Sequence, residues 1–409
     1  MHILAVNCGS SSIKFRLFDV DRDSRLIAKG LAERIGRESG SISLRVEDRQ
    51  EFRRELSLPD HRTAMHALHH ALAEGYSGLA EREGGIDGVG HRIVHGGERF
   101  RNPALIDADV IDGIKEAARF APLHCQPNIV GIEVAQELLP DIPHVAVFDT
   151  AAHQTLAPKA FLYGLPIELY EKYKIRRYGF HGINHSYVAN EAAKILALPL
   201  HDLKVITCHL GNGCSITAFE RGRSIDTSMG LTPLEGLVMG TRCGDLDPAI
   251  VLYLMDELGL TTSEVTDLLN TRSGLLGLCG NNDMRDIMAV AEQGQIRSQV
   301  AIDVFVYRIQ KYIGAYVAAM NGIDVVVFTG GIGENSPYIR QRVAANLGYL
   351  GADMNPEKND SGETVFSSDT SPLTLMTIPA NEEIAIAQHT YSMLAKSMET
   401  LVQTPKVKS

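Results

Sequence analysis

The strongest constraint in this sequence is one pattern that occurs twice, about two hundred residues apart. Residues 4–19 read LAVNCGSSSIKFRLFD, and residues 205–219 read VITCHLGNGCSITAF. Each segment combines an apolar strand, a turn of small residues and an alternating strand, which is typical of a β-hairpin. A repeat at this separation is far longer than a solenoid period, so it predicts two duplicated domains.

The first turn also has the features of an anion-binding loop. In residues 8–12 (CGSSS) the backbone N–H groups and hydroxyls are able to face phosphate oxygens, and Lys14 follows on the returning strand. An ordinary hairpin, with glycine for its turn geometry, explains this segment equally well. The second copy favours the functional interpretation, because two such hairpins facing each other would form a cleft.

Charge and cysteine content exclude several classes of protein. The 409 residues carry 50 acidic and 39 basic side chains, a formal charge of -11, which argues against a nucleic-acid or anionic-membrane partner. The six cysteines form no C-x-x-C pair, so neither a zinc site nor a disulfide framework is expected. No apolar run approaches the ~20 residues of a membrane span, and no leader pattern precedes the first strand. We therefore expect a cytoplasmic protein.

Two apolar strands end in residues suited to chemistry. Residues 86–100 form a strand that ends near paired glycines, with Arg92 close to its end, and residues 144–148 form a strand followed directly by Asp149. Open α/β sheets bind ligands at such strand ends. A structural ion pair is the alternative explanation for Arg92.

Glycine-rich loops occupy the second half. Residues 226–250 are rich in glycine and proline but too apolar for a linker, and they place Arg242 between Gly240 and Gly244. A buried strand beginning near Ile323 runs into a glycine-rich turn, with a helix expected near Pro337. That order is the context in which helix N-termini bind phosphate, although neither a Walker loop nor G-x-G-x-x-G is present.

Hydrophobic spacing predicts the main helices. They are residues 61–81, 167–173, 188–196, 251–258, 263–270 and 297–320, and a C-terminal helix whose polar tail from Lys396 is expected to fray. His181 and His185 lie four residues apart like a zinc-protease pair, but Gly182 and not a glutamate follows His181, so we expect no zinc there.

Nine motifs carry a family resemblance: VNCGSSSIKF, GHRIVHGG, VFDTAAHQ, RRYGFHG, HLGNG, MGLTPLEGLVMGTRCGDLDP, SGLLGL, FTGGIGEN and IPANEE. In this order, from about residue 2 to residue 390, they resemble the acetate and propionate kinases, which share the actin, hexokinase and heat-shock ATPase fold. The resemblance implies an α/β chain of two duplicated actin-like (ribonuclease H-like) domains with a nucleotide cleft between them. It places these domains at residues 1–150 and 151–383, with a helix of about 384–409 packing back onto the first.

The resemblance also implies ATP-dependent, reversible phosphorylation of a short carboxylate by direct in-line transfer, with Mg²⁺, or Mn²⁺ as an alternative ion. It implies a homodimer and ATP, ADP and a small carboxylate as ligands. Acetate is the preferred acceptor, and propionate is the alternative, because one methylene in an apolar pocket is worth only ~1 to 3 kcal/mol. A non-catalytic actin-like ATP-binding scaffold or switch is the alternative from another class.

Site residues follow from the resemblance position by position. The catalytic set is Arg92, Asp149, His181 and Arg242. Arg92 also joins Val94, Leu123 and Pro233 in the acid pocket, and Asn7 and Glu382, with Glu383 as an alternative, are linked to the metal. The residues expected to face the nucleotide are Ser10, Ser12, Lys14, His209, Leu210, Gly211, Asn212, Gly213, Asp283, Met284, Arg285, Gly331, Ile332, Gly333, Glu334 and Asn335.

These residue types suit phosphoryl transfer, which mainly needs in-line positioning and charge neutralisation. Guanidinium groups bond carboxylates and phosphoryl oxygens bidentately, and the imidazole of His181 is a donor whose strength depends on pH. Asp149 is expected to hold metal-bound waters or orient an arginine, because acetate is already ionised near neutral pH and needs no base.

Four positions depart from the family pattern. Ala152 stands where phenylalanine is usual, Ile183-Asn184 replace Thr-Ser, Cys243 replaces serine, and the segment 280–283 is shorter. Ala152 predicts a roomier wall near the carboxylate end, and Cys243 is expected to be a buried, inert thiol.

Overall fold

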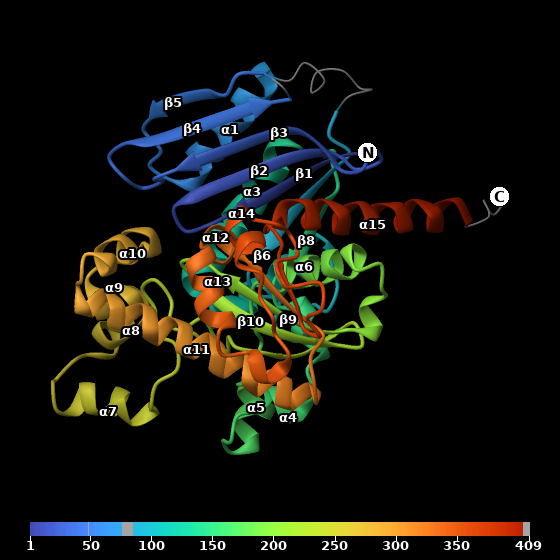
Figure 1. Ribbon diagram of the computed structural model, residues 1–409. Helices are drawn as coiled ribbons and strands as arrows, with labels where there is room; N and C mark the ends of the chain where they lie inside the picture. The colour runs from blue at the N-terminus through green and yellow to red at the C-terminus, as the bar shows by residue number, and fades with distance from the viewer. Residues whose placement is uncertain (48, 76–84, 404–409) are drawn as a thin grey trace, which may run out of the picture. The chain divides into compact units, whose positions relative to one another are not determined.

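The computed structural model describes residues 1–47, 49–75 and 85–403, without the side chains of 122–124 and 398–403. The chain divides into two compact units. Unit 1 comprises Met1–Ala151 and Asn381–Ser409, and unit 2 comprises Ala152–Ala380. Figure 1 shows the helices and strands with the labels used below.

Unit 1 is built on an eight-stranded sheet in the order β5-β4-β3-β2-β1-β6-β8-β7. Its strands are β1 (His2–Cys8), β2 (Ser12–Asp19), β3 (Arg25–Glu33), β4 (Gly40–Val46), β5 (Phe52–Leu56), β6 (Gly88–Ile93), β7 (Ala104–Leu105) and β8 (His144–Phe148). Strands β1 to β5 form an antiparallel meander, while β6 pairs in parallel with both β1 and β8. The ends of β1, β6 and β8 therefore lie at one edge of the sheet.

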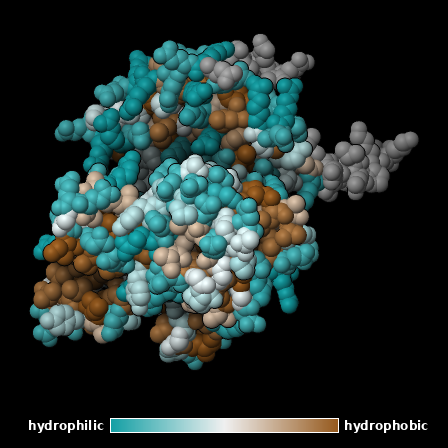
Figure 2. All heavy atoms as spheres, in the orientation of Figure 1, coloured by the Kyte–Doolittle hydropathy of each residue, from teal (hydrophilic) through white to brown (hydrophobic). Residues whose placement is uncertain are grey.

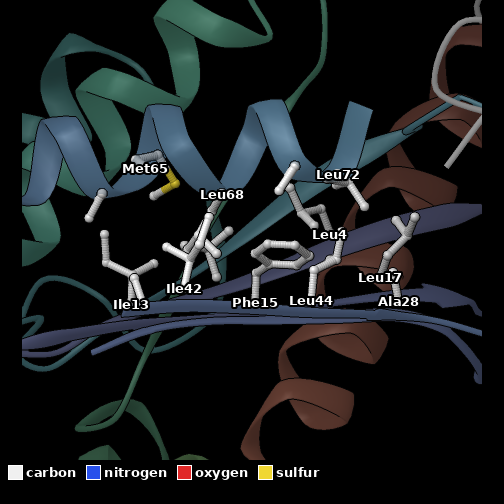
Figure 3. Packing of buried hydrophobic residues seen from close by; sticks show 14 of the residues in the cluster. Leu4, Ile13, Phe15, Leu17, Ala28, Ile42, Leu44, Met65, Leu68 and Leu72 are labelled. Carbon is white, nitrogen blue, oxygen red and sulfur yellow. The ribbon is translucent and has the colours of Figure 1, made fainter. Parts of the chain in front are cut away.

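Helices cover both faces of this sheet. They are α1 (His61–Gly75), α2 (Ala108–Ala117), η2 (Ala118–Phe120), α3 (Pro122–Leu138) and α15 (Glu382–Gln403). Met65, Leu68 and Leu72 of α1 pack on Phe15 and Leu44 of the sheet (Figure 3).

Helix α15 packs on β1 and β6. A Cβ atom on Gly90 of β6 would lie 2.2 Å from Thr390 Oγ1 and 2.7 Å from Ile386 Cγ2 of that helix. Glycine at this position therefore allows α15 to lie directly on the strand.

Unit 2 contains a five-stranded sheet in the order β11-β10-β9-β12-β13. Its strands are β9 (Lys204–Leu210), β10 (Cys214–Glu220), β11 (Arg223–Thr227), β12 (Val325–Thr329) and β13 (Thr374–Thr377). Its helices are η3 (Ala151–Thr155), which straddles the boundary, α4 (Pro158–Phe161), α5 (Ile167–Tyr173), α6 (Gly182–Ile195), η4 (Leu200–Asp202), α7 (Pro248–Asp256), α8 (Thr262–Thr271), α9 (Gly274–Cys279), α10 (Met284–Glu292), α11 (Ile296–Met320), α12 (Gly330–Asn335), α13 (Pro337–Ala344), η5 (Gly348–Leu350) and α14 (Pro356–Ser361).

The two sheets share one topology. The order β3-β2-β1-β6-β8 in unit 1 matches β11-β10-β9-β12-β13 in unit 2, and the parallel and antiparallel pairings correspond strand by strand. Both repeated segments are antiparallel hairpins, β1–β2 and β9–β10. The predicted α/β duplication is confirmed.

Three local predictions were wrong. Helix α6 begins at Gly182 and not near Val188, because tertiary packing buries Ile183 and His185 in its first turn. The glycine-rich segment after β12 is the short helix α12, whose start is held by Glu334 Oε1 on Gly330 N (2.8 Å). Helix α15 continues past Lys396 to Gln403, and the last six residues of the tail that was predicted to fray lie outside the described residues.

Helix α1 is described as far as Gly75, and the remainder of its predicted span, residues 76–81, lies outside the described residues. Within the described ranges, no helix combines the length and apolar character needed to cross a membrane.

Candidate functional site

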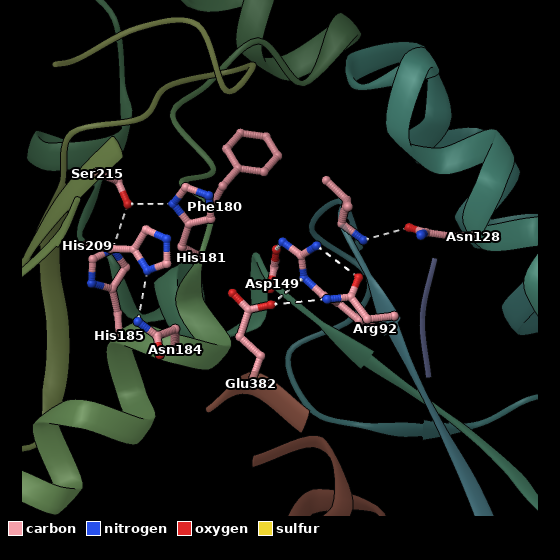
Figure 4. A network of polar contacts seen from close by, with 12 residues as sticks. Arg92, Asn128, Asp149, Phe180, His181, Asn184, His185, His209, Ser215 and Glu382 are labelled. Carbon is pink, nitrogen blue, oxygen red and sulfur yellow. Dashed lines mark hydrogen bonds and ion pairs between the residues drawn. The ribbon is translucent and has the colours of Figure 1, made fainter. Parts of the chain in front are cut away.

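Unit 1 gathers four of the predicted residues at the edge where β1, β6 and β8 end (Figure 4). Arg92 Nη2 donates to Asp149 Oδ2 at 2.5 Å, and Arg92 Nη1 donates to Asn7 Oδ1 at 3.2 Å. Arg92 Nε lies 3.3 Å from Glu382 Oε2, which also accepts from Asn7 Nδ2 at 3.4 Å. We call these four residues the Arg92 cluster.

The Arg92 cluster has an excess of negative charge. Asp149 is completely buried. Burial alone would lower the pKa of Arg92, but the carboxylates of Asp149 and Glu382 outweigh this effect and raise it, so the guanidinium stays charged. One cation between two carboxylates leaves one negative charge. Arg92 is thus held in ion pairs, while Glu382 Oε2 faces the amide nitrogen of Asn7 and the amide oxygen of Asn7 faces Arg92.

The geometry distinguishes Glu382 from Glu383. Glu382 contacts Asn7 and Arg92, whereas Glu383 Oε2 lies 3.7 Å from Arg16 Nε on β2. Among the residues that the structure describes, no three His, Cys, Asp or Glu side chains form a metal-binding group. The oxygens of Asn7 and Glu382 match the sparse protein ligation of Mg²⁺, which keeps several of its waters.

Asn128 supports this edge and was missed from the sequence. Its Oδ1 accepts from the Val94 N–H at 3.0 Å, and its Nδ2 donates to the Cys8 carbonyl at 2.9 Å. It therefore ties the end of β1 to the segment after β6. It is one of several polar residues of α3, so the sequence carries no distinct signal for this role. The Leu123 side chain lies outside the described residues.

The first hairpin turn presents its side chains to solvent. It is closed by a 2.8 Å hydrogen bond from Gly9 N to the Ser12 carbonyl. Ser10 and Lys14 are exposed and Ser12 is half-buried. Lys14 is paired with Asn7 in the β1–β2 register, so its ammonium lies on the same face as that amide.

Unit 2 brings together the second hairpin turn, His181 and Arg242. A Cβ atom on Gly213 would lie 3.6 Å from both Arg242 Nη1 and His181 Cε1. The Arg242 loop is fastened to this turn, since Gly240 N donates to the Asn212 carbonyl at 2.9 Å. Position 213 therefore lies within contact distance of both side chains.

Arg242 has a different environment from Arg92. Its Nη1 donates to the Pro233 carbonyl at 3.1 Å, and burial lowers its pKa. No carboxylate of the described residues forms an ion pair with it. A desolvated guanidinium without a carboxylate partner is well suited to bind an oxyanion.

His181 occupies the N-cap of α6 with φ of 55°, a left-handed conformation that is uncommon outside glycine. Its ring stacks on His209 with centroids 4.3 Å apart, and Asn184 Nδ2 lies 2.9 Å from His209 Nδ1. His209 therefore supports His181. Ser215 Oγ lies 2.8 Å from His181 Nδ1, a contact that sequence reasoning missed.

A hollow of about 390 Å³ in unit 2 collects half of the predicted nucleotide residues. Its lining consists of Gly211, Asn212, Asp283, Met284, Arg285, Met288, Gly331, Ile332, Asn335 and Ser336. Met288 and Ser336 were not foreseen. Despite the short segment 280–283, Asp283 and Arg285 both reach the hollow.

Several predicted nucleotide residues are absent from this lining. Leu210 is fully buried in the sheet, and Glu334 uses its carboxylate to accept from Gly330 N and Ala380 N. Gly333 is buried, and its carbonyl accepts from Arg340 Nη1. Leu210 belongs to β9 and the other two residues belong to α12, and none of the three lines the hollow.

Two departures from the family pattern have plain structural settings. The half-buried Cys243 thiol donates to the Gly244 carbonyl, and burial raises its pKa to about 11. It is therefore an unreactive thiol near neutral pH. Ala152 begins unit 2 and is half-buried.

Comparisons with known proteins agree along nearly the whole chain. Residues 2–388 match the model of the Acetokinase family. The acetate kinase of Carboxydothermus hydrogenoformans is 47% identical over 396 residues, which cover 96% of this chain and 99% of that relative.

Two solved structures are also similar. A propionate kinase from Francisella tularensis has a TM-score of 0.90 and 43% identity, over 96% of this chain and 99% of its own. An acetate kinase from Porphyromonas gingivalis has a TM-score of 0.86 and 38% identity over the same shares.

Proposed function

Because this chain belongs to the acetokinase family, we propose that it transfers the γ-phosphoryl group of ATP to acetate, giving acetyl phosphate and ADP, and that it also catalyses the reverse reaction. The main support for this proposal is the match to the family model over residues 2–388. Both charged groupings described above, the Arg92 cluster and the His181–Arg242 pair, fall within it. We expect the enzyme to work in the cytosol.

In unit 2, the proposal assigns the phosphoryl group to Arg242 and His181. In-line transfer spreads charge over the oxygens of the moving group, and donors fixed in place stabilise that charge without reorganising. Arg242 supplies a guanidinium without a carboxylate partner, and Gly213 lies beside it. The hollow lined by Asp283, Arg285 and Asn335 would hold the nucleoside.

In unit 1, the proposal assigns the acid and the metal to the Arg92 cluster. Arg92 would bind the acetate carboxylate while Asp149 orients it from behind. Asn7 and Glu382 would hold Mg²⁺ through water, Mn²⁺ being the alternative ion, and Lys14 would face a phosphate. When bound, the ion neutralises phosphate charge. Asp149 need not act as a base, because acetate is already ionised.

Acetate and propionate differ by one methylene, and Val94 is the residue that we expect to separate them. Val94 is 7% exposed and its backbone N–H is held by Asn128, so we expect that it cannot easily move to make room for a larger acid. The similar propionate kinase from Francisella tularensis makes propionate the second candidate.

A coupled assay of ADP release with formate, acetate, propionate and butyrate tests the choice of substrate. We expect kcat/KM to be highest for acetate and to fall by roughly 10-fold or more for propionate. A clear preference for propionate would assign the chain to the second candidate.

We also propose that the enzyme is a homodimer. Helix α7 buries no residue within the chain, and Leu252, Tyr253 and Leu258 are each about 60% exposed. Figure 2 shows apolar side chains gathered at the lower left, in the region of α7 to α11. Exposed apolar area on this scale is typical of an interface. Light scattering of the intact chain should give twice the monomer mass, and Leu252→Asp should give the monomer.

A further inference from the structure

A chain of hydrogen bonds runs from His181 into the core of unit 2 (Figure 4). Ser215 Oγ of β10 lies 2.8 Å from His181 Nδ1 and 2.7 Å from His185 Nε2. His185 Nδ1 in turn lies 2.6 Å from Thr207 Oγ1 of β9. The last three side chains of this path, Ser215, His185 and Thr207, are all 0% exposed.

Each side chain along this hydrogen-bond path has only one hydrogen to donate. Burial, and then the neighbouring rings of His153 and His209, hold the pKa of His185 well below its usual value, so the ring is neutral and carries one N–H. The hydroxyls of Ser215 and Thr207 carry one hydrogen each. With one donor available per link, all the bonds must run in the same direction, either toward His181 or away from it.

The surroundings of Thr207 favour one direction. If the bonds ran away from His181, His185 Nδ1–H would donate to Thr207, and the Thr207 hydroxyl would need another acceptor. The Thr217 carbonyl is 3.5 Å away, which is at the limit of a useful hydrogen bond. In the other direction Thr207 donates to His185 Nδ1, His185 Nε2–H donates to Ser215, and Ser215 donates to His181 Nδ1.

We propose that Ser215 and His185 are positioning residues that make His181 Nδ1 an acceptor and so keep the single proton of the neutral His181 ring on Nε2. His181 then presents an N–H donor at neutral pH without needing a second proton. Its charged and titratable neighbours are Arg242 across Gly213, the stacked ring of His209 and the ring of His185.

This inference builds on the proposed function, because the assignment of His181 to the transferring phosphoryl group rests on that function. It also changes the expectation from sequence that the donor strength of His181 follows pH. In the intact protein the donor is present in the neutral ring, so kcat should not require protonation of His181.

Ring ¹⁵N NMR of the intact protein tests the tautomer without turnover. We expect protonated Nε2 and unprotonated Nδ1 for His181 at pH 7.5. A proton on Nδ1 would overturn the proposal. If the tautomer is as expected but no short acid is phosphorylated, then the proposed function fails and the hydrogen-bond direction stands.

A matched pair of variants tests the consequence for catalysis. Ser224→Ala is the control for Ser215→Ala, because Ser224 is also buried in this sheet and bonds a different buried histidine, His153, at 2.9 Å. Ser215→Ala should lower kcat roughly 10-fold, with little change in KM for ATP, and should add an ionisation near pH 6.5 to the kcat profile. Ser224→Ala should leave kcat and its pH profile unchanged. Equal kcat values and equal pH profiles for the two variants would overturn the proposal.

Discussion

The two sheets of this protein share their strand order but differ in what stands at the strand ends. In unit 1, β6 ends at Arg92 and Ile93, and β8 is followed by Asp149, so charged side chains occupy the edge. In unit 2, the corresponding strand β12 ends at Thr329 and continues into Gly330 and Gly331. One sheet places charge where the other leaves space for a ligand.

The charges themselves also differ between the halves. Arg92 is held by two carboxylates, whereas Arg242 bonds a carbonyl oxygen and has no ion pair within the described residues. The same scaffold therefore carries a cluster with negative excess in one half and a donor set with positive excess in the other. The two units thus share their strand order and pairing but differ in the charged side chains that they carry.

Arg242→Ala should have the largest effect on catalysis of the substitutions considered. Removing the guanidinium that has no carboxylate partner should lower kcat by ~10³-fold, as for other preorganised donors, while ADP affinity changes by less than about twofold. Steady-state kinetics and calorimetric titration of ADP measure the two effects. Arg272→Ala is the matched control, because Arg272 is an exposed arginine of unit 2 in a surface ion pair with Asp267. An unchanged kcat in Arg242→Ala would remove this residue from the catalytic set.

Asp149→Asn tests the opposite arrangement in unit 1. The change leaves Arg92 with Glu382 alone and misorients the guanidinium, so kcat/KM for acetate should fall by ~10²-fold. Asp109→Asn, which removes a carboxylate from an exposed ion pair with Arg99, should leave acetate kinetics unchanged. If both variants kept full activity, the Arg92 cluster would be purely structural.

Acid should destabilise unit 2 through His153. Burial lowers the pKa of His153 to about 4, below its usual value near 6.5, so the unfolded state binds a proton that the folded state rejects. Stability is then fully present above pH 6.5 and falls as the pH drops toward 4. This residue should account for about 2 kcal/mol of lost unfolding free energy between pH 7 and pH 5. Denaturant titrations at both pH values measure the loss.

A substitution isolates the contribution of His153. His153→Gln should flatten the pH dependence by that amount, whereas His201→Gln, which changes an exposed histidine, should not. Identical slopes for all three proteins would show that His153 titrates alike in the folded and unfolded states.

Glu382 and Glu383 give the smallest contrast. Glu382→Gln should raise the Mg²⁺ concentration needed for half-maximal activity by ~10-fold, because its carboxylate lies beside Asn7. Glu383→Gln should have little effect, since that carboxylate lies near Arg16. The activity of each variant is followed against Mg²⁺ concentration. A larger effect of Glu383→Gln would exchange the two roles.

The framework was predictable from the sequence because the repeated hairpins and strand-end residues leave local signals. Arg92 and Asp149 could be singled out by their places near the ends of apolar strands, and the structure brings them within 2.5 Å. Other residues of the unit 2 hollow, such as Asp283 and Asn335, could be predicted only from the family resemblance.

The supporting polar groups could not be predicted in the same way. Asn128, Ser215 and Thr207 act through contacts between elements distant in sequence, and an isolated buried polar residue has no periodic signature. The start of α6 was missed because packing and not helix propensity decides it. Helix α12 was missed because its ends are capped by Glu334 and Arg340, two side chains whose partners are not apparent from spacing.

The most direct test of the central claim is to trap the acyl phosphate. The intact protein is incubated with ATP, Mg²⁺ and acetate in the presence of hydroxylamine, and acetohydroxamate is measured together with ADP. We expect equal amounts of both products, formed only when ATP and acetate are present together. Tight ATP binding without any acetohydroxamate would contradict the account and indicate an ATP-binding switch built on the same fold.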